Sequence, residues 1–380
     1  MRNISWRHFD FWLLGAVAFL TIFGVAMISS AIAGNPTLVE ANTVTKQMIF
    51  AAAGFAVMFL TAVIDYRYWS AVSNFLYLIT ASILAVLYLF GATLFGSTRW
   101  FTLGPILIQP SEIAKIIIIL ILADFFSKNI EKINQPLTIL RSVLVTGGIM
   151  IWVLIQPDLS TSIVLLVLWF ALLWASGLKV KQLLIASGAG AMALLVGFPL
   201  MLLSYSNETT GGLIKPYQIR RIINFLFPEE DASYGAIYNV QQALISIGSG
   251  GWLGRGYGSG SQVQLRFLKV RHSDFIFSAL AEEFGFAGAL AVLLLLAFII
   301  YRCLRAARMA GDTYGALTAY GVAALITFQT IVNVSVNLKL LPVTGLTLPF
   351  VSYGGSSLIT LFIGIGLVES VILRHKELEF

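Results

Sequence analysis

Long apolar runs separated by short polar segments dominate this chain. A helix needs roughly 20 residues to cross about 30 Å of hydrocarbon. The runs are continuously apolar, whereas strands of a membrane barrel alternate over about ten residues. The pattern predicts an all-α, polytopic integral membrane protein that forms one domain over residues 1–380. Ten transmembrane helices are predicted at 10 to 32, 46 to 64, 72 to 95, 112 to 126, 141 to 155, 160 to 176, 182 to 203, 276 to 301, 313 to 337 and 356 to 373.

Composition and charge support lipid as the main solvent. Apolar residues make up 58% of the 380 residues and charged residues only 11%, against about 25% charged in soluble domains. If the N-terminus is cytoplasmic, Lys and Arg concentrate in the inside segments, so the positive-inside rule places both termini in the cytoplasm. This bias accounts for the net charge of +6. Nucleic acid is excluded as a partner, because no basic soluble domain with interleaved aromatic residues is evident.

One connection is far longer than the others. Residues 204–275 form a predicted extracytoplasmic loop between the seventh and eighth helices, and loops of that length are usually functional. The stretch Pro216 to Pro228 has the apolar spacing of an amphipathic helix on the membrane surface, beside Arg221. Two interpretations of the glycines from Gly248 to Gly260 stay open: a flexible linker, or a close backbone approach to an anionic ligand.

Ionisable residues within the apolar runs are the next candidates, because a charge in the bilayer needs a partner or a polar cavity. Glu112 and Lys115 are three residues apart on one helix face, which suits either an ion pair or part of a site. Asp158 suits an N-cap of the sixth helix or a group in that site. Asp124 and Glu369 lie near helix ends, where we expect both carboxylates to reach water.

The junction between the long loop and the eighth helix carries the strongest candidate for chemistry, Asp274. Its alternative role is to cap that helix. Glu282 and Glu283 follow it and suit either neutralisation of loop arginines or a cavity wall. Asn333 and Asn337, four apart in the ninth helix, are expected to make interhelical hydrogen bonds.

The ordered motifs resemble the SEDS family of bacterial membrane glycosyltransferases along essentially the whole chain. They are GSTRWF, QPSEIAK, QPDLST, PYQIRRIINFL, IGSGGWLGRG, RHSDFIFSALAEEFGF and LPVTGLTLPFVSYGGSS. Ten helices with a large outer loop between the seventh and eighth are also that family's architecture. The stretch GSGSQVQLRFLKVRHSDFIF is more similar to the elongation branch, RodA, than to the division branch, FtsW.

The resemblance implies a peptidoglycan polymerase that acts on lipid II in the bacterial cytoplasmic membrane. Asp274 would be the general base of an inverting transfer, and polyprenyl pyrophosphate would be the leaving group. The resemblance also implies a divalent cation, Mg or Mn, with Glu112 and Asp274 as the candidate ligands. The substrate-binding candidates are Arg99, Lys115, Arg221 and Arg271 for the pyrophosphate, His272 as a hydrogen-bonding neighbour, and Glu112 and Asp158 in a groove shared with Asp274.

The resemblance implies a protein partner as well, a class B penicillin-binding protein that crosslinks the glycan. Its contact surface is expected on the outer segment and on the eighth and ninth helices. Three alternatives remain: a division-type polymerase, a lipid II flippase or other transporter, and a non-catalytic scaffold. Transporters often show internal repeats, and none is convincing in this sequence.

Overall fold

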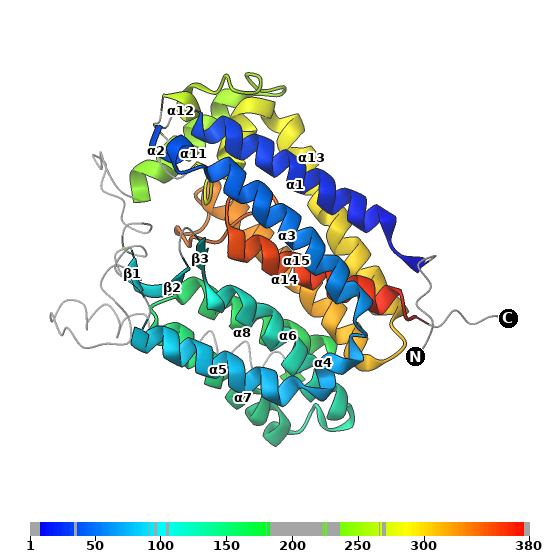
Figure 1. Cartoon of the computed structure of the whole chain (residues 1–380). Helices are drawn as coiled ribbons and strands as arrows, with labels where there is room; N and C mark the ends of the chain where they lie inside the picture. Colours follow the sequence, from blue (N-terminus) through cyan, green and yellow to red (C-terminus); the bar gives the residue numbers. More distant parts are fainter. Residues whose placement is uncertain are drawn as a thin grey trace.

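The chain folds into a bundle of long helices with two distinct ends (Figure 1). The computed structural model describes residues 8–33, 36–90, 92–94, 97–103, 106–179, 181–182, 223, 225, 236–265, 267 and 271–375. We name one end of the bundle the termini end, because His8 and His375 meet there with ring centroids 5.0 Å apart. The opposite end is the sheet end, because it carries three short strands.

Helices make up most of the described chain. Nine of the ten predicted membrane helices overlap an observed helix, and the seventh predicted run lies outside the described residues apart from Gln182. The helices are α1 (Phe11–Ile32), α2 (Pro36–Glu40), α3 (Thr43–Val63), α4 (Arg67–Ala71), α5 (Ser73–Phe90), α6 (Pro110–Lys128), η2 (Ile130–Lys132), α7 (Pro136–Ile155), α8 (Leu159–Ala175), α11 (Ala236–Gly250), α12 (Ser261–Gln264), α13 (Ile276–Met309), α14 (Thr313–Asn337) and α15 (Gly355–Ile372).

Local sequence explains where these helices begin. Asp10 caps α1 by accepting a hydrogen bond from the Leu13 N–H at 3.0 Å, and Asp312 caps α14 through the Gly315 N–H at 2.7 Å. Both carboxylates satisfy an N–H that has no partner inside its helix. Proline occupies the first position of α6 and of α7, where its missing N–H costs nothing.

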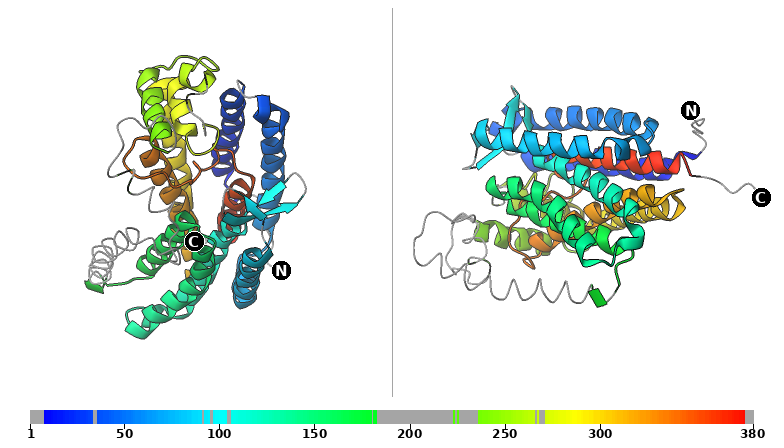
Figure 2. Two further views of the ribbon diagram at one scale, coloured as in Figure 1. Left: turned by 90° about the vertical axis from the view of Figure 1, so that its left-hand side faces the viewer. Right: turned by 90° about the horizontal axis from the view of Figure 1, so that it is seen from below.

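The bundle is tightest between α3 and α15, which lie side by side (Figures 1 and 2). A Cβ added at Gly54 would come within 2.2 Å of the Phe362 ring, and one at Gly366 within 2.5 Å of the Met58 carbonyl oxygen. Small residues let helices in a bilayer approach this closely, and packing then replaces the hydrophobic effect as the source of association. Helix α15 also packs against α6 and α14, so the interior of the bundle consists of these three helices.

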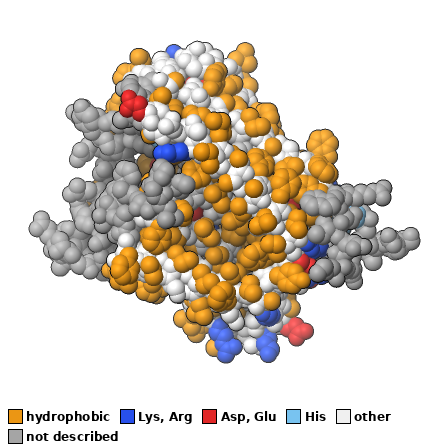
Figure 3. Space-filling model, in the orientation of Figure 1, with side chains coloured by type: hydrophobic (Ala, Val, Ile, Leu, Met, Phe, Trp, Pro, Cys, Tyr) orange, Lys and Arg blue, Asp and Glu red, His pale blue; other side chains and the backbone are white. Residues whose placement is uncertain are grey.

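Seven of the described helices are long and apolar enough to cross a membrane: α1, α3, α5, α7, α13, α14 and α15. Helix α8 is apolar but shorter. Helix α6 carries Glu112, Lys115 and Asp124, yet 14 of its 19 residues are buried, and these three charged residues are among them. Figure 3 shows hydrophobic side chains over the middle of the molecule, with the coloured charges mostly toward its edges. The chain is a multi-pass membrane protein.

A small antiparallel sheet corrects the all-α prediction. Strands β1 (Ala92–Leu94), β2 (Ser97–Leu103) and β3 (Ile106–Ile108) pair in that order. The predicted third helix, 72 to 95, therefore ends at Phe90 in α5. Hydropathy alone extended the helix, whereas the threonines and aromatic residues of 92–103 favour a strand. The fold is mostly helical with one short sheet.

The glycine run after α11 packs against a kink in α13. Gly285 lies inside α13 with φ 65°, ψ −166°, so the helical hydrogen bonds are interrupted there. The loop backbone replaces them: the Phe286 N–H donates to the Gly251 carbonyl at 2.8 Å, and the Arg255 N–H donates to the Glu282 carbonyl at 3.0 Å. A Cβ at Gly254 would lie 2.2 Å from the Glu283 carbonyl oxygen. These glycines serve a close backbone approach to α13. Neither a flexible linker nor an approach to an anionic ligand describes this contact.

Two carboxylates expected to reach water are buried instead. Asp124 is held by Ser73 at 3.0 Å and by Lys128 at 2.7 Å, and the lysine is the exposed partner. Glu369 is fully buried and accepts a hydrogen bond from the Asp10 N–H at 3.0 Å. The expectation was wrong because Asp124 packs against the start of α5 and Glu369 against the residue before α1, and the sequence gives no indication of either contact.

Candidate active site

Asp274 lies at the sheet end, in the turn 271–275 that leads into α13. We call these residues the Asp274 segment. The N-cap of α13 is Phe275. Asp274 immediately precedes it, and its side chain is half-buried.

Two buried amides from α14 hold the backbone of this segment. Asn333 and Asn337 each donate from Nδ2 to the main-chain carbonyl of Asp274 at 3.0 Å. Asn337 also accepts, through Oδ1, from the Ser278 N–H at 3.1 Å and the Ser278 hydroxyl at 2.6 Å. The predicted interhelical hydrogen bond is confirmed for Asn337, which bonds Ser278 of α13. The Asn333 amide instead bonds the turn before α13 and the Leu346 carbonyl in the loop after α14. The consequence of these bonds is that α14 fixes the position of Asp274 relative to the first turn of α13.

The loop between α14 and α15 holds the segment from a second side. Ser352 donates from Oγ to the Ser273 carbonyl at 2.8 Å, and the Tyr353 N–H donates to the His272 carbonyl at 2.9 Å. Gly345 in the same loop has φ +82°, and a Cβ built on it would lie 3.8 Å from Oδ2 of Asp274. The loop therefore runs directly beside the carboxylate.

A second acid, Asp158, gathers polar groups from α6, α8 and β2. It caps α8 through the Thr161 N–H at 3.2 Å, which confirms one of its two expected roles. Its carboxylate also accepts from Gln109 Nε2 at 3.0 Å, and Arg99 Nη1 lies 3.9 Å from Oδ1. The Arg99 guanidinium donates to the carbonyls of Gln156 at 3.1 Å and of Pro157, at the end of α7. Arg99 is thereby held where α7 ends and α8 begins.

Glu112 and Lys115 form a buried ion pair in the first turns of α6. Lys115 Nζ lies 2.7 Å from Glu112 Oε2, and the lysine side chain is fully buried. An unpaired ammonium in such surroundings would be very costly, so the carboxylate is needed to keep it. The expected ion pair is confirmed, and it lies in the same helix start as the groups around Asp158.

The segments that carry the two acids contact one stretch of loop. Ser160, two residues beyond Asp158, donates to the Thr344 carbonyl, and Thr344 precedes the Gly345 that borders Asp274. The loop at 344–345 therefore has the start of α8 on one side and the Asp274 segment on the other. The expected groove is not itself described: the cavities that the structure shows near Asp10 and near Asp124 lie at the termini end.

The remaining candidates are placed differently. Arg271 is buried, and its Nε donates to the Ala31 carbonyl at the end of α1, where a cation is favoured by the helix dipole. His272 lies 5.7 Å from the Tyr353 ring. Burial, and then the charge of Arg271, lower the pKa of His272 to about 4, so its ring is neutral at pH 7. Arg221 lies outside the described residues.

Glu282 and Glu283 adopt structural roles in the described chain. Glu282 accepts from the Gln262 N–H at 2.8 Å and the Val263 N–H at 3.3 Å, at the start of α12. Glu283 accepts from the Ser30 hydroxyl of α1. Both glutamates connect the glycine-rich loop and α1 to α13, two turns beyond Asp274. Both glutamates therefore stabilise the segments around the site. This differs from both expected roles, neutralisation of loop arginines and a cavity wall.

Sequence reasoning missed two groups, Gly345 and Ser352. Gly345 lies next to the Asp274 carboxylate. The sequence could have indicated it through LPVTG, in which the glycine is typical of a turn. Ser352 carries no signal in the sequence, because its partner at Ser273 is 79 residues away. For a metal, the described residues contain no group of three or more His, Cys, Asp or Glu that could hold an ion.

Comparisons with known proteins identify the family. A family model described as "Cell cycle protein", covering FtsW, RodA and SpoVE, matches residues 11–377. The chain is 33% identical over 379 residues to a probable peptidoglycan glycosyltransferase FtsW of Hydrogenovibrio crunogenus, covering 97% of this chain and 92% of that protein. It is 35% identical over 371 residues to the peptidoglycan glycosyltransferase MrdB of Escherichia coli, covering 98% and 95%.

Solved structures agree with this assignment. One, from work on polymerization and crosslinking by a peptidoglycan synthase complex, aligns with a TM-score of 0.78 at 31% identity, covering 96% of this chain and 97% of that one. The rod shape determining protein RodA of Thermus thermophilus aligns with a TM-score of 0.70 at 29% identity, covering 98% and 99%. The chain therefore belongs to the FtsW, RodA and SpoVE family, the SEDS family of peptidoglycan glycosyltransferases.

Proposed function

We propose that this protein polymerises lipid II into glycan strands by an inverting transfer in which Asp274 is the general base. The observation that carries the proposal is the placement of Asp274: a half-buried carboxylate at the start of α13 whose main-chain carbonyl accepts hydrogen bonds from Asn333 and Asn337. A positioned carboxylate is the group that such a transfer needs. Family membership supplies the substrate class.

The reaction places clear demands on the site. The 4-hydroxyl oxygen of the acceptor sugar forms a bond to the anomeric carbon of the donor, and its proton passes to the Asp274 carboxylate. The bond from that carbon to the pyrophosphate oxygen breaks, and its electron pair leaves with polyprenyl pyrophosphate. Positive groups that face the departing oxygens lower the barrier.

Among the proposed pyrophosphate contacts, Arg99 has the most favourable setting in the described chain. Its guanidinium is partly exposed and is oriented by two carbonyls and by Asp158. Lys115 brings less net charge because Glu112 neutralises it at 2.7 Å. Arg271 is directed to α1, and Arg221 keeps its proposed role from the sequence alone. His272, neutral at pH 7, would act through hydrogen bonds only.

A divalent cation, Mg or Mn, is part of the proposal for the substrate pyrophosphate. Mg²⁺ usually binds through one or two carboxylates together with substrate phosphates, and it would neutralise the charge of the leaving group. The proposed protein ligands are Asp274 and Glu112, and Oε2 of Glu112 also accepts a hydrogen bond from Lys115. The test is polymerisation after chelation and after return of each metal, with lipid II binding measured separately.

The proposed role is cell elongation, with a class B penicillin-binding protein as partner. A structural neighbour comes from a complex that joins polymerization to crosslinking, and relatives named FtsW and MrdB match equally well. Rescue of rod shape in cells depleted of their own elongation polymerase would support elongation. Rescue of division alone would assign the protein to the septum. For the partner, we propose the exposed sides of α13 and α14.

The deciding experiment compares Asp274→Ala and Asp274→Asn with the parent, each purified with its partner and supplied with labelled lipid II. We expect polymerisation to fall on the order of 10²-fold or more, since general base catalysis contributes about 10² to 10⁴, while lipid II binding by Asp274→Asn persists. The matched control is Asp312→Asn at the termini end, which keeps the cap of α14. Equal polymer from parent and Asp274→Ala would exclude the base. Lipid II movement across vesicles without polymer would favour a flippase.

A further inference from the structure

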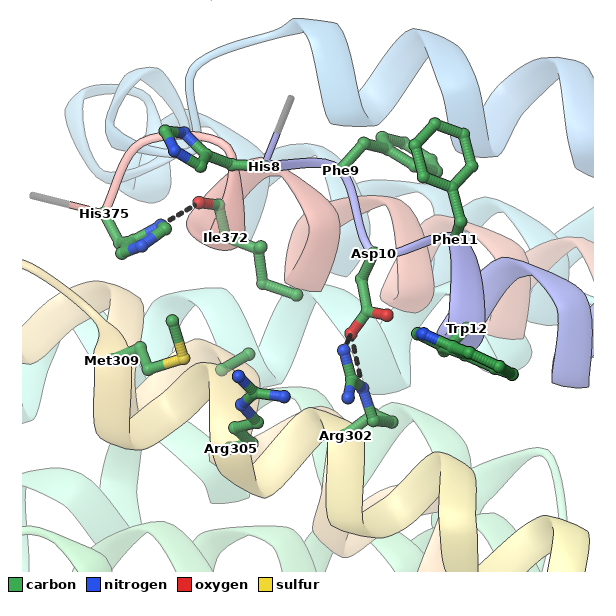
Figure 4. Close-up of a pocket in the computed structure, with 11 residues that line it drawn as sticks. His8, Phe9, Asp10, Phe11, Trp12, Arg302, Arg305, Met309, Ile372 and His375 are labelled. Carbon is green, nitrogen blue, oxygen red and sulfur yellow. Dashed lines mark hydrogen bonds and ion pairs between the residues drawn. The ribbon is translucent and has the colours of Figure 1, made fainter. Parts of the chain in front are cut away.

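A cavity at the termini end has no part in the proposed chemistry. Its volume is about 340 Å³, and it lies between the start of α1, the last turns of α13 and the end of α15 (Figure 4). The walls combine cations, histidines and aromatic rings: His8, Phe11, Trp12, Arg302, Arg305 and His375. A cavity that combines positive charge with apolar surface suits a ligand that has an anionic group and an apolar part.

The charges inside the cavity do not balance. Asp10 Oδ2 accepts from Arg302 Nε at 2.6 Å and lies 2.5 Å from Arg302 Nη2, and Asp10 Oδ1 caps α1. Both oxygens of that carboxylate are therefore occupied. Arg305, one turn further along α13, makes no hydrogen bond or ion pair within the described chain, and it is exposed. Glu369 does not line the cavity, because it is fully buried behind the Asp10 backbone.

The aromatic residues place the opening at the boundary between water and lipid. Trp12 is 75% exposed and Phe11 is 66% exposed. Figure 4 shows the Trp12 ring beside Arg302, on the wall opposite His375. Tryptophan favours the headgroup level of a bilayer. Positive charge at this level, at the end of the bundle predicted to be cytoplasmic, attracts anionic headgroups.

We propose that this cavity binds the phosphate headgroup of an anionic phospholipid. Arg305, with the N–H groups of Arg302 that Asp10 leaves available, donates hydrogen bonds to the phosphate oxygens. An acyl chain lies along Phe11 and Trp12. A lipid held in this way bridges α1 to α13, and through Asp10 and Glu369 it adds to the contacts of α15.

A second cavity at the same end shows why the charge balance matters. It has a volume of about 480 Å³ and is lined by Asp124 and Lys128 among polar and apolar neighbours. These two residues form an ion pair at 2.7 Å, so the cavity carries no net charge from its lining. An anion gains nothing there, and the comparison assigns the anionic headgroup to the cavity that holds Arg305.

The test measures lipid binding to the purified full-length protein. Phosphatidylglycerol, phosphatidylcholine and inorganic phosphate are each titrated into protein in neutral detergent, with thermal unfolding and native mass spectrometry as readouts. We expect phosphatidylglycerol to raise the unfolding temperature and to stay bound, and the other two probes to do neither. Arg305→Gln is expected to weaken phosphatidylglycerol binding about fivefold, the worth of one arginine at a membrane surface.

The matched control is Arg308→Gln, an exposed arginine three residues after Arg305 on the same helix that does not line the cavity. Trp12→Ala should weaken the lipid but not a free anion. Equal effects of the two lipids, or equal losses for Arg305→Gln and Arg308→Gln, would overturn the proposal. Stabilisation by inorganic phosphate alone would replace the lipid with a free anion. Polymerisation in neutral detergent is expected to persist in every variant, so this test and that of Asp274 fail independently.

Discussion

The acids of the termini end and the Asp274 segment of the sheet end are held in different ways, although the sheet end also contains the ion pair of Glu112 with Lys115. At the termini end, cations pair directly with acids: Arg302 with Asp10 at 2.5 Å, Arg67 with Asp312 at 2.9 Å and Lys128 with Asp124 at 2.7 Å. At the sheet end, the Asp274 segment is held mainly by neutral amides and hydroxyls that bond its main chain.

This difference has a chemical reason. A cation close to a carboxylate favours the ionised form and lowers its pKa, which makes the group a weaker base. An amide that bonds the main-chain carbonyl fixes the residue without adding charge beside its side chain. The termini end therefore uses ionic contacts for structure, whereas neutral side chains position the main chain of Ser273 and Asp274.

Among substitutions that test this contrast, Asn337→Ala is expected to have the largest effect on turnover. The substitution removes a donor to the Asp274 carbonyl and an acceptor for Ser278, so the base moves relative to the substrates. A displacement of about 1 Å is enough for a loss on the order of 10²-fold in turnover. We expect kcat for polymerisation to fall by that amount, while the pH profile of the remaining activity keeps its shape, because the base itself is unchanged.

Thr330→Val in the same helix is the control. The Thr330 hydroxyl donates only to the Ile326 carbonyl of its own helix, at 2.8 Å, so its loss should leave turnover near that of the parent. Full activity in Asn337→Ala at equal folded yield would contradict a positioning role. A changed pH profile would mean that Asn337 acts on the carboxylate itself.

A smaller effect, about tenfold in turnover, is expected from Gly345→Ala. The substitution forces an L-residue into a left-handed conformation at a cost of roughly 1 to 2 kcal/mol, and the new methyl would lie 3.8 Å from Asp274 Oδ2. Gly177→Ala gives the matched control, since Gly177 also has positive φ, +97°, and a Cβ there meets nothing within 4 Å.

Both glycine variants should lose similar thermal stability, because both suffer the same backbone strain. Only Gly345→Ala should lose turnover, because Gly177 follows α8 at the termini end. Equal turnover in the two variants would show that the loop beside Asp274 does not control the position of the base.

The sequence predicted the helices better than it predicted the contacts between distant segments. Apolar runs of helical length identified α1, α3, α13, α14 and α15 because a bilayer imposes that length on any spanning helix. The pairing of Glu112 with Lys115 was also predictable, because three residues separate them on one helix. These are local relations along the chain.

The contacts that the sequence could not predict join distant segments. Ser352 meets Ser273 across 79 residues, and the Asp10 N–H meets Glu369 across 359. No periodicity encodes such contacts. The strands at 92–108 were missed for another reason, since hydropathy does not distinguish an apolar strand from the end of a helix.

The smallest predicted effect concerns pH and His272. Burial, and secondly the charge of Arg271, lower its pKa to about 4, whereas an exposed histidine has a pKa of about 6.5. The unfolded chain therefore binds the additional proton between these values, so the stability associated with a neutral His272 is complete above pH 6.5 and is lost as the pH falls toward 4. At pH 5 the loss is about 2 kcal/mol, at roughly 1.4 kcal/mol per pH unit.

His272→Gln removes the titrating ring. The unfolding temperature of this variant should therefore depend less on pH between 7.5 and 5 than that of the parent. The variant is expected to be as stable at pH 5 as at pH 7.5, apart from the contribution of other groups that the parent shares. An unchanged slope would mean that His272 is already solvated and able to take up its proton in the folded protein. In that case the Asp274 segment is less tightly enclosed than its neutral hydrogen bonds imply, and the contrast between the two ends would weaken.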